Sequence, residues 1–258
     1  MSTVENCAIV KKVSPAKGIW DVTVAAPQIC AQITAPGQFL NIKVGEKVLR
    51  RPISICDWGK ELVRFVFEVR GEGTAWLAER AAGDVLDILG PLGNGFEQAG
   101  NCKNAIAVGG GIGVFPLLGL CETVAANGGS ADALLGFRSK DNAVLLGDFM
   151  QAKANVAVAT DDGTLGIHGF VTEILEKRLA SGKECDGIFT CGPAPMMKKV
   201  AETAQKYNVP CYVSMEQRMG CGTGACLVCS CRVKKADGEG YVRVCKDGPV
   251  FKAESLVW

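Results

Sequence analysis

The sequence lacks a charge imbalance and a long apolar run, and it has a single histidine. Lysine and arginine number 28 against 27 acidic residues, so there is no net basic field for a phosphate backbone, and we expect no nucleic acid partner. The longest apolar stretch, Ala105 to Cys121, contains five glycines and one proline and falls short of the roughly 18 apolar residues of a span. We therefore expect no membrane helix.

A secretory leader is also missing from the N-terminal residues. Met1 to Lys12 has no basic segment followed by an apolar one, which predicts a cytoplasmic, reducing location. In such a compartment, scattered cysteines are mostly buried thiols, whereas closely spaced ones usually hold metal or carry redox chemistry. With 13 cysteines in 258 residues, their spacing becomes the central question.

The hydrophobic rhythm changes along the chain. From about Cys7 to Ile88 apolar residues tend to alternate, with glycine and proline between the runs, which favours an antiparallel barrel or sandwich. After Asn101 short buried strands alternate with helices, which is typical of a parallel α/β sheet. From Val213 on, regular periodicity disappears. We predict a β-barrel domain, an α/β nucleotide-binding domain and a small metal-held tail, at residues 1–100, 101–212 and 213–258.

Individual elements can be predicted in the second half. The strands are expected at 105–108, 133–137, 156–160 and 187–191, and the helices at 115–126, 170–180 and 195–206. Glycines follow two of these strands. The first run includes Gly109, Gly110, Gly111 and Gly113, and the second is Cys191-Gly192-Pro193. Glycine loops after parallel strands outline a nucleotide crevice, although no glycine stands at 115 or 116 as the dinucleotide fingerprint requires, and the second loop could be a plain turn.

Four cysteines near the C-terminus carry the strongest signal. Cys221, Cys226, Cys229 and Cys245 are separated by four, two and fifteen residues, and the first three match the plant-type iron-sulfur spacing. Glycines between them allow a tight wrap around a cluster. The alternatives are a structural zinc site, which normally uses two short paired spacings, and unligated core cysteines. Cys231 could in principle replace Cys229, but the spacing favours Cys229.

A flavin site is suggested in the first half. Arg51-Pro52-Ile53-Ser54 opens a strand and directs an arginine and a serine to one face, where they could bind a pyrophosphate and approach a flavin ring. Gly73 and Thr74 stand at the start of a helix expected to run to Ala82, where an anion is favoured. The alternatives are a surface arginine beside a turn proline and a simple threonine cap.

With these motifs in order, the chain resembles the ferredoxin-NADP reductase superfamily and, within it, the electron transfer subunits of class B dihydroorotate dehydrogenases. The resemblance covers nearly the whole chain, although Ile53 replaces a stacking tyrosine of many flavin reductases and Glu68 an expected basic residue. The segments that carry it are Arg51–Ser54, Gly71–Thr74, Gly109–Gly113, Cys191–Pro193, Met219–Cys229 and Val244–Phe251.

The resemblance implies three cofactors and one partner. FAD would bind in the barrel, with Val66, Phe67 and Glu68 among its contacts, NAD would bind in the α/β domain, and a 2Fe-2S cluster would lie on the four cysteines. An FMN-containing dihydroorotate dehydrogenase catalytic subunit would be the partner, in a heterotetramer of two of each chain. The alternatives are the small subunit of an NADH-dependent ferredoxin-NADP oxidoreductase or sulfide dehydrogenase, and a non-enzymatic electron carrier.

Overall fold

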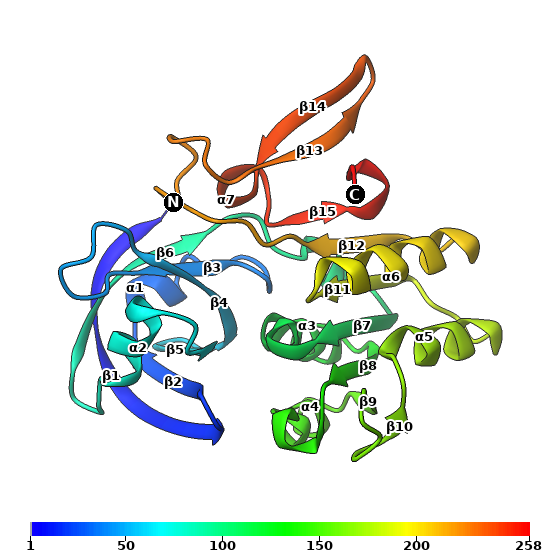
Figure 1. Cartoon of the computed structure of the whole chain (residues 1–258), viewed down its shortest axis with the longest axis horizontal. Helices are drawn as coiled ribbons and strands as arrows, with labels where there is room; N and C mark the ends of the chain where they lie inside the picture. Colours follow the sequence, from blue (N-terminus) through cyan, green and yellow to red (C-terminus); the bar gives the residue numbers. More distant parts are fainter. Residues whose placement is uncertain (1) are drawn as a thin grey trace.

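The computed structural model describes residues 2–258, and its first half is a closed antiparallel barrel (Figure 1). The strands follow the order β1-β2-β5-β4-β3-β6, and alternate apolar side chains fill the interior, as expected for a sheet closed on itself. The expected barrel is therefore confirmed. Its elements are β1 (Thr3–Ala16), β2 (Ile19–Ala25), α1 (Pro27–Cys30), β3 (Phe39–Ile42), β4 (Arg51–Trp58), β5 (Leu62–Glu68), α2 (Glu72–Ala78) and β6 (Val85–Leu92).

The second half is a seven-stranded sheet of order β10-β9-β8-β7-β11-β12-β15. All neighbours are parallel except β15, which is antiparallel to β12. Helices α3 and α4 cover one face and α5 and α6 the other. The bounds are β7 (Asn104–Gly110), α3 (Phe115–Ala126), β8 (Ser130–Phe137), α4 (Leu146–Gln151), β9 (Asn155–Thr160), β10 (Ile167–His168), α5 (Val171–Ala180), β11 (Gly187–Cys191), α6 (Ala194–Lys206), β12 (Cys211–Ser214) and β15 (Val250–Lys252).

The four predicted strands lie within β7, β8, β9 and β11, and the three predicted helices match α3, α5 and α6 to within one residue at each end. The helix expected to run from Gly73 to Ala82 is wrong at its end, because α2 stops at Ala78. After α2 the chain turns and pairs with β1, where Gly83 N–H donates to Ile9 O (2.8 Å). This long-range pairing ends the helix.

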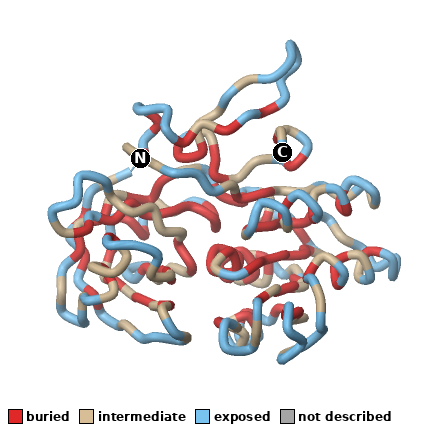
Figure 2. The backbone as a smooth tube through the Cα atoms, viewed as in Figure 1, coloured by how far each residue is buried: buried red, intermediate tan, exposed pale blue. Residues whose placement is uncertain are grey.

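The C-terminal segment is more regular than its sequence indicates. It contains a hairpin of β13 (Ser230–Lys235) and β14 (Gly238–Arg243), followed by α7 (Val244–Asp247). The hairpin projects from the body and is largely exposed (Figure 2). Although sequence periodicity disappears from Val213 on, β12 (Cys211–Ser214) spans that position and β15 returns to the sheet. The three-domain division stays a prediction. Among the described residues no helix has the length and apolar character needed to cross a bilayer.

Helix α3 packs on strand β4 and joins the barrel to the α/β sheet. One apolar core runs across this joint and includes Cys56 and Val66 from the barrel and Phe115 from α3. The backbones approach closely, because a Cβ atom at Gly119 would lie 2.9 Å from Trp58 Cζ3 and 3.0 Å from Cys56 O. A larger residue at Gly119 would push the two halves apart.

Charged side chains also cross the joint. Arg64 on β5 binds Asp21 on β2 (Nη2–Oδ2 2.7 Å) and Asp148 on α4 (Nη1–Oδ1 2.5 Å). Beside them, burial raises the pKa of Glu122 on α3 to about 8, and the charge of Asp57 on β4 and a hydrogen bond to it act in the same direction. Two carboxyl groups in contact cannot both ionise cheaply, so Glu122 keeps its proton at neutral pH.

This carboxyl pair predicts a pH dependence of stability. The pKa of Glu122 is raised from 4.5 to about 8 on folding, so its contribution is fully present below about pH 4.5 and is lost as pH rises through about 8. In the wild-type chain the urea unfolding midpoint should fall as pH rises from about 4.5 to 8, and in Glu122→Gln it should fall less. Glu202→Gln changes an exposed residue of α6 and should show the wild-type dependence on pH. Equal slopes for all three proteins would contradict the assignment.

Candidate functional site

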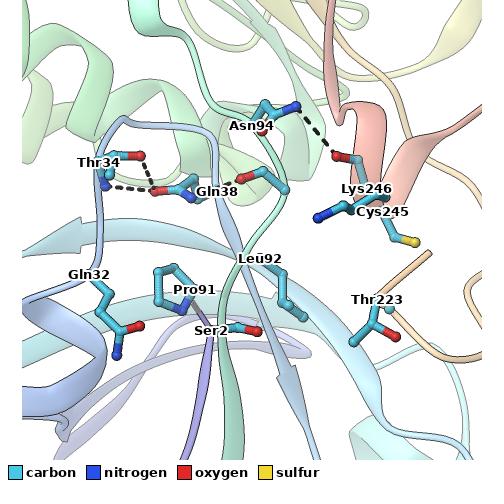
Figure 3. Close-up of a pocket in the computed structure, with 12 residues that line it drawn as sticks. Ser2, Gln32, Thr34, Gln38, Pro91, Leu92, Asn94, Thr223, Cys245 and Lys246 are labelled. Carbon is cyan, nitrogen blue, oxygen red and sulfur yellow. Dashed lines mark hydrogen bonds between the residues drawn. The ribbon is translucent and has the colours of Figure 1, made fainter. Parts of the chain in front are cut away.

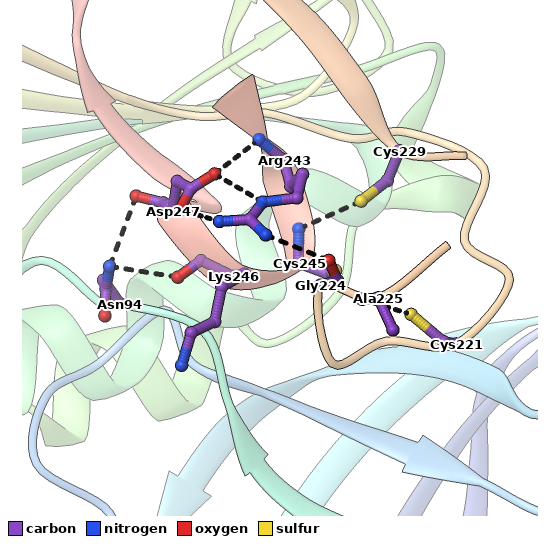
Figure 4. A network of polar contacts seen from close by, with 9 residues as sticks. All are labelled: Asn94, Cys221, Gly224, Ala225, Cys229, Arg243, Cys245, Lys246 and Asp247. Carbon is purple, nitrogen blue, oxygen red and sulfur yellow. Dashed lines mark hydrogen bonds and ion pairs between the residues drawn. The ribbon is translucent and has the colours of Figure 1, made fainter. Parts of the chain in front are cut away.

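Three of the predicted cluster cysteines lie in the loop between β12 and β13, and the fourth lies in α7 (Figure 4). Backbone N–H groups of the loop point at the sulfurs. Thr223 and Ala225 donate to Cys221 Sγ (3.4 and 3.3 Å), and Cys221 donates to Cys226 Sγ (3.3 Å). Such donors stabilise negative charge on sulfur. The glycine-bearing loop is therefore wrapped around the thiols as the spacing indicates.

The second pair of cysteines is buried. Cys229 and Cys245 are each 2% exposed, and Cys245 N–H donates to Cys229 Sγ (3.4 Å). Burial raises the pKa of Cys245 to about 12, with the contact to Cys229 acting in the same direction. For Cys221, burial opposes ionisation, but hydrogen bonds at Thr223 and Cys226 outweigh it and lower the pKa to about 5. Cys221 is thus ready as a thiolate ligand, whereas Cys245 needs a nearby positive charge to lose its proton.

The four cysteines form a thiolate donor set that suits an iron-sulfur cluster. Their side chains contact each other in two pairs, Cys221 with Cys226 and Cys229 with Cys245. A two-iron cluster takes two thiolates on each iron, whereas structural zinc gathers four ligands around one centre. Cys231 lies on β13 in the same apolar cluster as Cys229.

Residues that the sequence analysis missed connect the cysteine loop to α7. Arg243 forms a double contact with Asp247 (Nε–Oδ2 3.0 Å and Nη2–Oδ1 2.9 Å) and donates from Nη1 to Gly224 O (3.0 Å). From the barrel side, Asn94 Nδ2 donates to Asp247 O (3.2 Å) and Lys246 O (3.4 Å) (Figure 4). Arg243 and Asp247 stand four residues apart on either side of Cys245, and this spacing could have predicted their ion pair.

A cavity of about 260 Å³ lies where the cysteine segment meets the barrel. Thr223 and Cys245 line it from one side, and Gln38, Leu92 and Asn94 from the other (Figure 3). The cysteine segment also shares an apolar cluster with the barrel, in which Phe39, Leu92, Cys229, Cys231, Val244 and Cys245 are buried. The cysteines are therefore seated directly on strands β3 and β6.

The predicted flavin residues of the barrel come partly together. Arg51 at the start of β4 lies over the first turn of α2, since a Cβ atom at Gly73 would be 2.4 Å from Arg51 Nε. Thr74 is the third residue of α2, and its Oγ1 accepts N–H groups of Arg70 (2.9 Å) and Gly71 (3.1 Å). The hydroxyl therefore caps the helix start. The remaining residues of the motif, Pro52, Ile53 and Ser54, follow on β4 and are half-buried.

The end of β5 is divided between core and surface. Phe67 points into the barrel core and stacks on Phe65, with ring centroids 6.3 Å apart. Val66 belongs to the core of the joint between barrel and sheet. Glu68 is half-buried and accepts a hydrogen bond from Arg70 Nε (2.6 Å). Of these three predicted contacts, only Glu68 has a side chain outside a packed core.

The two glycine loops of the α/β half lie against each other. Strands β7 and β11 are neighbours, with Gly109 opposite Cys191. A Cβ atom at Gly113 would lie 2.3 Å from Cys191 O, and Gly192 has a φ of +148°, a conformation that glycine adopts readily. Because this packing excludes side chains, the loops form one backbone-lined edge at the carboxyl ends of the strands, which is where nucleotides bind in such sheets.

Comparisons with known proteins agree with this arrangement. Residues 216–257 match the family described as the iron-sulfur cluster binding domain of dihydroorotate dehydrogenase B. The chain is 42% identical over 224 residues (86% of this chain, 87% of the relative) to the dihydroorotate dehydrogenase B (NAD(+)) electron transfer subunit of Caldanaerobacter subterraneus subsp. tengcongensis. It is 38% identical over 261 residues (98% of each chain) to the subunit of that name from Bacillus mycoides.

Among solved structures, a structure of the NADH-dependent reduced ferredoxin-NADP oxidoreductase is similar over 98% of this chain and 90% of its own. The TM-score is 0.87 and the sequence identity is 31%. The likeness therefore includes the cysteine segment as well as the barrel and the α/β sheet.

The Arg243–Asp247 contact predicts a loss of iron when it is removed. Arg243→Ala should lower iron retention by about tenfold or more, because residues that support metal ligands typically contribute that much to affinity. The check is iron and acid-labile sulfide per chain after anaerobic purification and a chelator challenge. Arg232→Ala removes an exposed arginine that pairs with Glu239 on the hairpin and should retain wild-type iron. Equal iron in both variants would contradict the prediction.

Proposed function

The chain belongs to the family of electron transfer subunits of dihydroorotate dehydrogenase B (NAD(+)), and from this premise we propose a specific electron route. Electrons pass from a flavin-containing catalytic subunit, which oxidises dihydroorotate, through a 2Fe-2S cluster and FAD to NAD+. The observation that carries the proposal is the seating of the paired cysteines on the barrel strands β3 and β6. A cluster carries single electrons, a flavin exchanges single electrons and hydride, and nicotinamide takes hydride.

The cluster ligands in this proposal are Cys221, Cys226, Cys229 and Cys245. The N–H groups of Thr223, Ala225 and Cys245 would offset the negative charge of the ligated thiolates. Arg243 adds a positive charge and holds the loop at Gly224. These residues fix the ligands before any metal binds, which lowers the ordering cost of binding.

FAD would bind along β4. The Arg51 guanidinium would grip the pyrophosphate with two parallel N–H groups, and its position against Gly73 supports this role. Pro52, Ile53, Ser54, Glu68 and Thr74 would line the flavin and its chain. Val66 and Phe67 are buried, so their contribution would come from the backbone.

NAD would bind at the two glycine loops. Gly109, Gly110, Gly111 and Gly113 would present backbone N–H groups without side chains in the way, and Cys191-Gly192-Pro193 would close the edge from β11. Burial raises the pKa of Cys191 to about 12, with the charge of Glu216 adding to it. This thiol therefore stays neutral and contributes shape to the site, with no nucleophilic role.

The FMN-containing catalytic subunit would dock beside the cysteine loop, in a complex of two copies of each chain. Leu227 (63% exposed), Val228 (57%) and Tyr241 (69%) form an apolar surface next to the exposed Cys226. A hollow of about 510 Å³ opens between Leu227 and Tyr241. Exposed apolar residues gathered at a redox centre are typical of a partner site. The closely spaced cysteines must stay reduced to hold iron, so the complex would lie in the cytoplasm.

A second candidate is the small subunit of an NADH-dependent reduced ferredoxin-NADP oxidoreductase. The structural likeness over 98% of this chain favours it, but the identity of 31% is lower than the 42% shared with the dihydroorotate dehydrogenase B subunit. The two candidates share the route between cluster, FAD and nicotinamide. They differ in the partner, so the partner must decide between them.

The proposed route predicts that NADH reduces the bound flavin of the purified chain. Bleaching of the flavin band should follow NADH addition in anaerobic stopped flow. Gly113→Ala should slow it by about 100-fold, since displacing a bound reactant by about 1 Å can have this effect. Gly147→Ala in α4 has open space around its Cβ and should behave as wild type. A chain without iron and flavin, or without bleaching, would contradict the proposal.

The partner assignment has its own test. Co-expression with a dihydroorotate-oxidising flavoprotein should give a stable complex with dihydroorotate-to-NAD+ activity. Tyr241→Glu should weaken this complex by about tenfold or more, because buried tyrosines often dominate interfaces, while flavin bleaching by NADH stays unchanged. Phe170→Glu changes an equally exposed aromatic residue (65%) before α5 and should bind normally. No complex with the wild-type chain would favour the second candidate.

A further inference from the structure

Asn41, a buried residue of strand β3, contacts the cysteine loop from the outer face of the barrel, the face that it shares with Phe39. The residue is 1% exposed, and its Nδ2 donates to the carbonyl oxygen of Cys221 at 3.3 Å. Asn41 also lies against the next residue, because a Cβ atom at Gly222 would lie 2.5 Å from Asn41 Nδ2. The first proposed cluster ligand is therefore hydrogen-bonded through its own backbone to the barrel.

The barrel holds Asn41 firmly. Its backbone oxygen accepts from Arg50 Nη1 (3.3 Å), which also donates to Asp87 O (3.0 Å), and Arg50 Nη2 lies 2.8 Å from Asp87 Oδ1. Asn41 is also paired with Pro52 on β4, within the Arg51–Ser54 flavin motif. One residue thus connects the strand proposed to bind FAD with the loop proposed to bind the cluster.

The amide group of Asn41 is not explained by the packing of the barrel. Among the described residues, its Oδ1 is buried without a hydrogen-bond partner, which is unfavourable for a polar atom. An apolar side chain of the same size would remove that cost. What the amide provides is the single donor to Cys221 O.

This donor fixes the orientation of the loop backbone. The peptide between Cys221 and Gly222 is trans, so its C=O and N–H point in opposite directions. With the carbonyl bound to Asn41, the N–H of Gly222 is turned away from the barrel. The next donors, Thr223 N–H and Ala225 N–H, reach Cys221 Sγ. The orientation of the whole N–H array follows from where the Cys221 carbonyl is held.

We infer that Asn41 is a positioning residue for the iron-sulfur site, which holds the Cys221 peptide so that loop N–H groups face the sulfurs and ties this loop to the flavin strand β4. The inference rests on the proposed function. Hydrogen bonds to cluster sulfurs favour the more negative, reduced state. Loss of the Asn41 donor therefore makes the cluster harder to reduce.

The test uses the full-length chain, purified anaerobically with iron and flavin bound. Asn41→Leu keeps the size and removes the donor. We expect a more negative midpoint potential, a changed EPR spectrum of the reduced cluster, and about tenfold slower cluster reduction by NADH through the flavin. Asn41→Val also removes the donor, with a side chain that suits a strand, so its potential should shift in the same direction.

The matched control is Gln38→Leu. Gln38 is also a buried amide of the barrel, but its partners are Thr34 and Gly93 and not the cysteine loop. It should leave the potential and EPR spectrum unchanged. Iron loss in Asn41→Leu but not in Gln38→Leu also supports the inference. A wild-type potential and spectrum in Asn41→Val overturn the inference. Iron loss from both leucine variants also overturns it if Asn41→Val keeps the wild-type potential and spectrum. A wild-type chain without iron or flavin contradicts the proposed function itself.

Discussion

The packing of α3 on β4 is the contact on which the rest of the structure depends. It places the helix that follows the glycine loop directly on the strand that opens with Arg51. The absence of a side chain at Gly119 permits this approach, and the shared apolar core stabilises it. If the two halves separated by even a few ångströms, the residues proposed to bind the flavin and those proposed to bind the nucleotide could no longer act on one hydride.

Charge along this joint is balanced in a way that limits how the halves can move. Arg64 is held by carboxylates from both sides, Asp21 in the barrel and Asp148 in the α/β half. The partly buried position of these groups makes their attraction stronger than at an exposed surface. The neighbouring Glu122 avoids repulsion from Asp57 by keeping its proton. The joint therefore has an apolar core, and the charged groups beside that core are paired or neutral.

In the cysteine segment, ligated thiolates would place negative charge beside the apolar cluster of Phe39 and Leu92. The N–H groups of Thr223 and Ala225 donate to Cys221 Sγ, and Arg243 adds a positive charge at Gly224; both stabilise negative charge on the sulfurs. The barrel contributes through Asn41 and through the apolar cluster around Phe39 and Leu92. The segment thus packs on the outside of the barrel at β3 and β6, although its last strand, β15, pairs with the α/β sheet.

Sequence alone determined the features that are local and periodic. The helices α3, α5 and α6 and the strands before the glycine loops could be predicted because periodicity carries their signal. The ligand role of the four cysteines stays a prediction from their spacing. The early end of α2, the strands β12 and β15, and the inward direction of Phe67 could not, because each depends on a distant partner. The roles of Asn41 and Glu122 likewise came only from the tertiary structure. Asn41 and Cys221 are 180 residues apart in the chain, and the proton of Glu122 is retained because the fold buries the carboxyl group. Neither feature has a local sequence pattern from which it could be predicted.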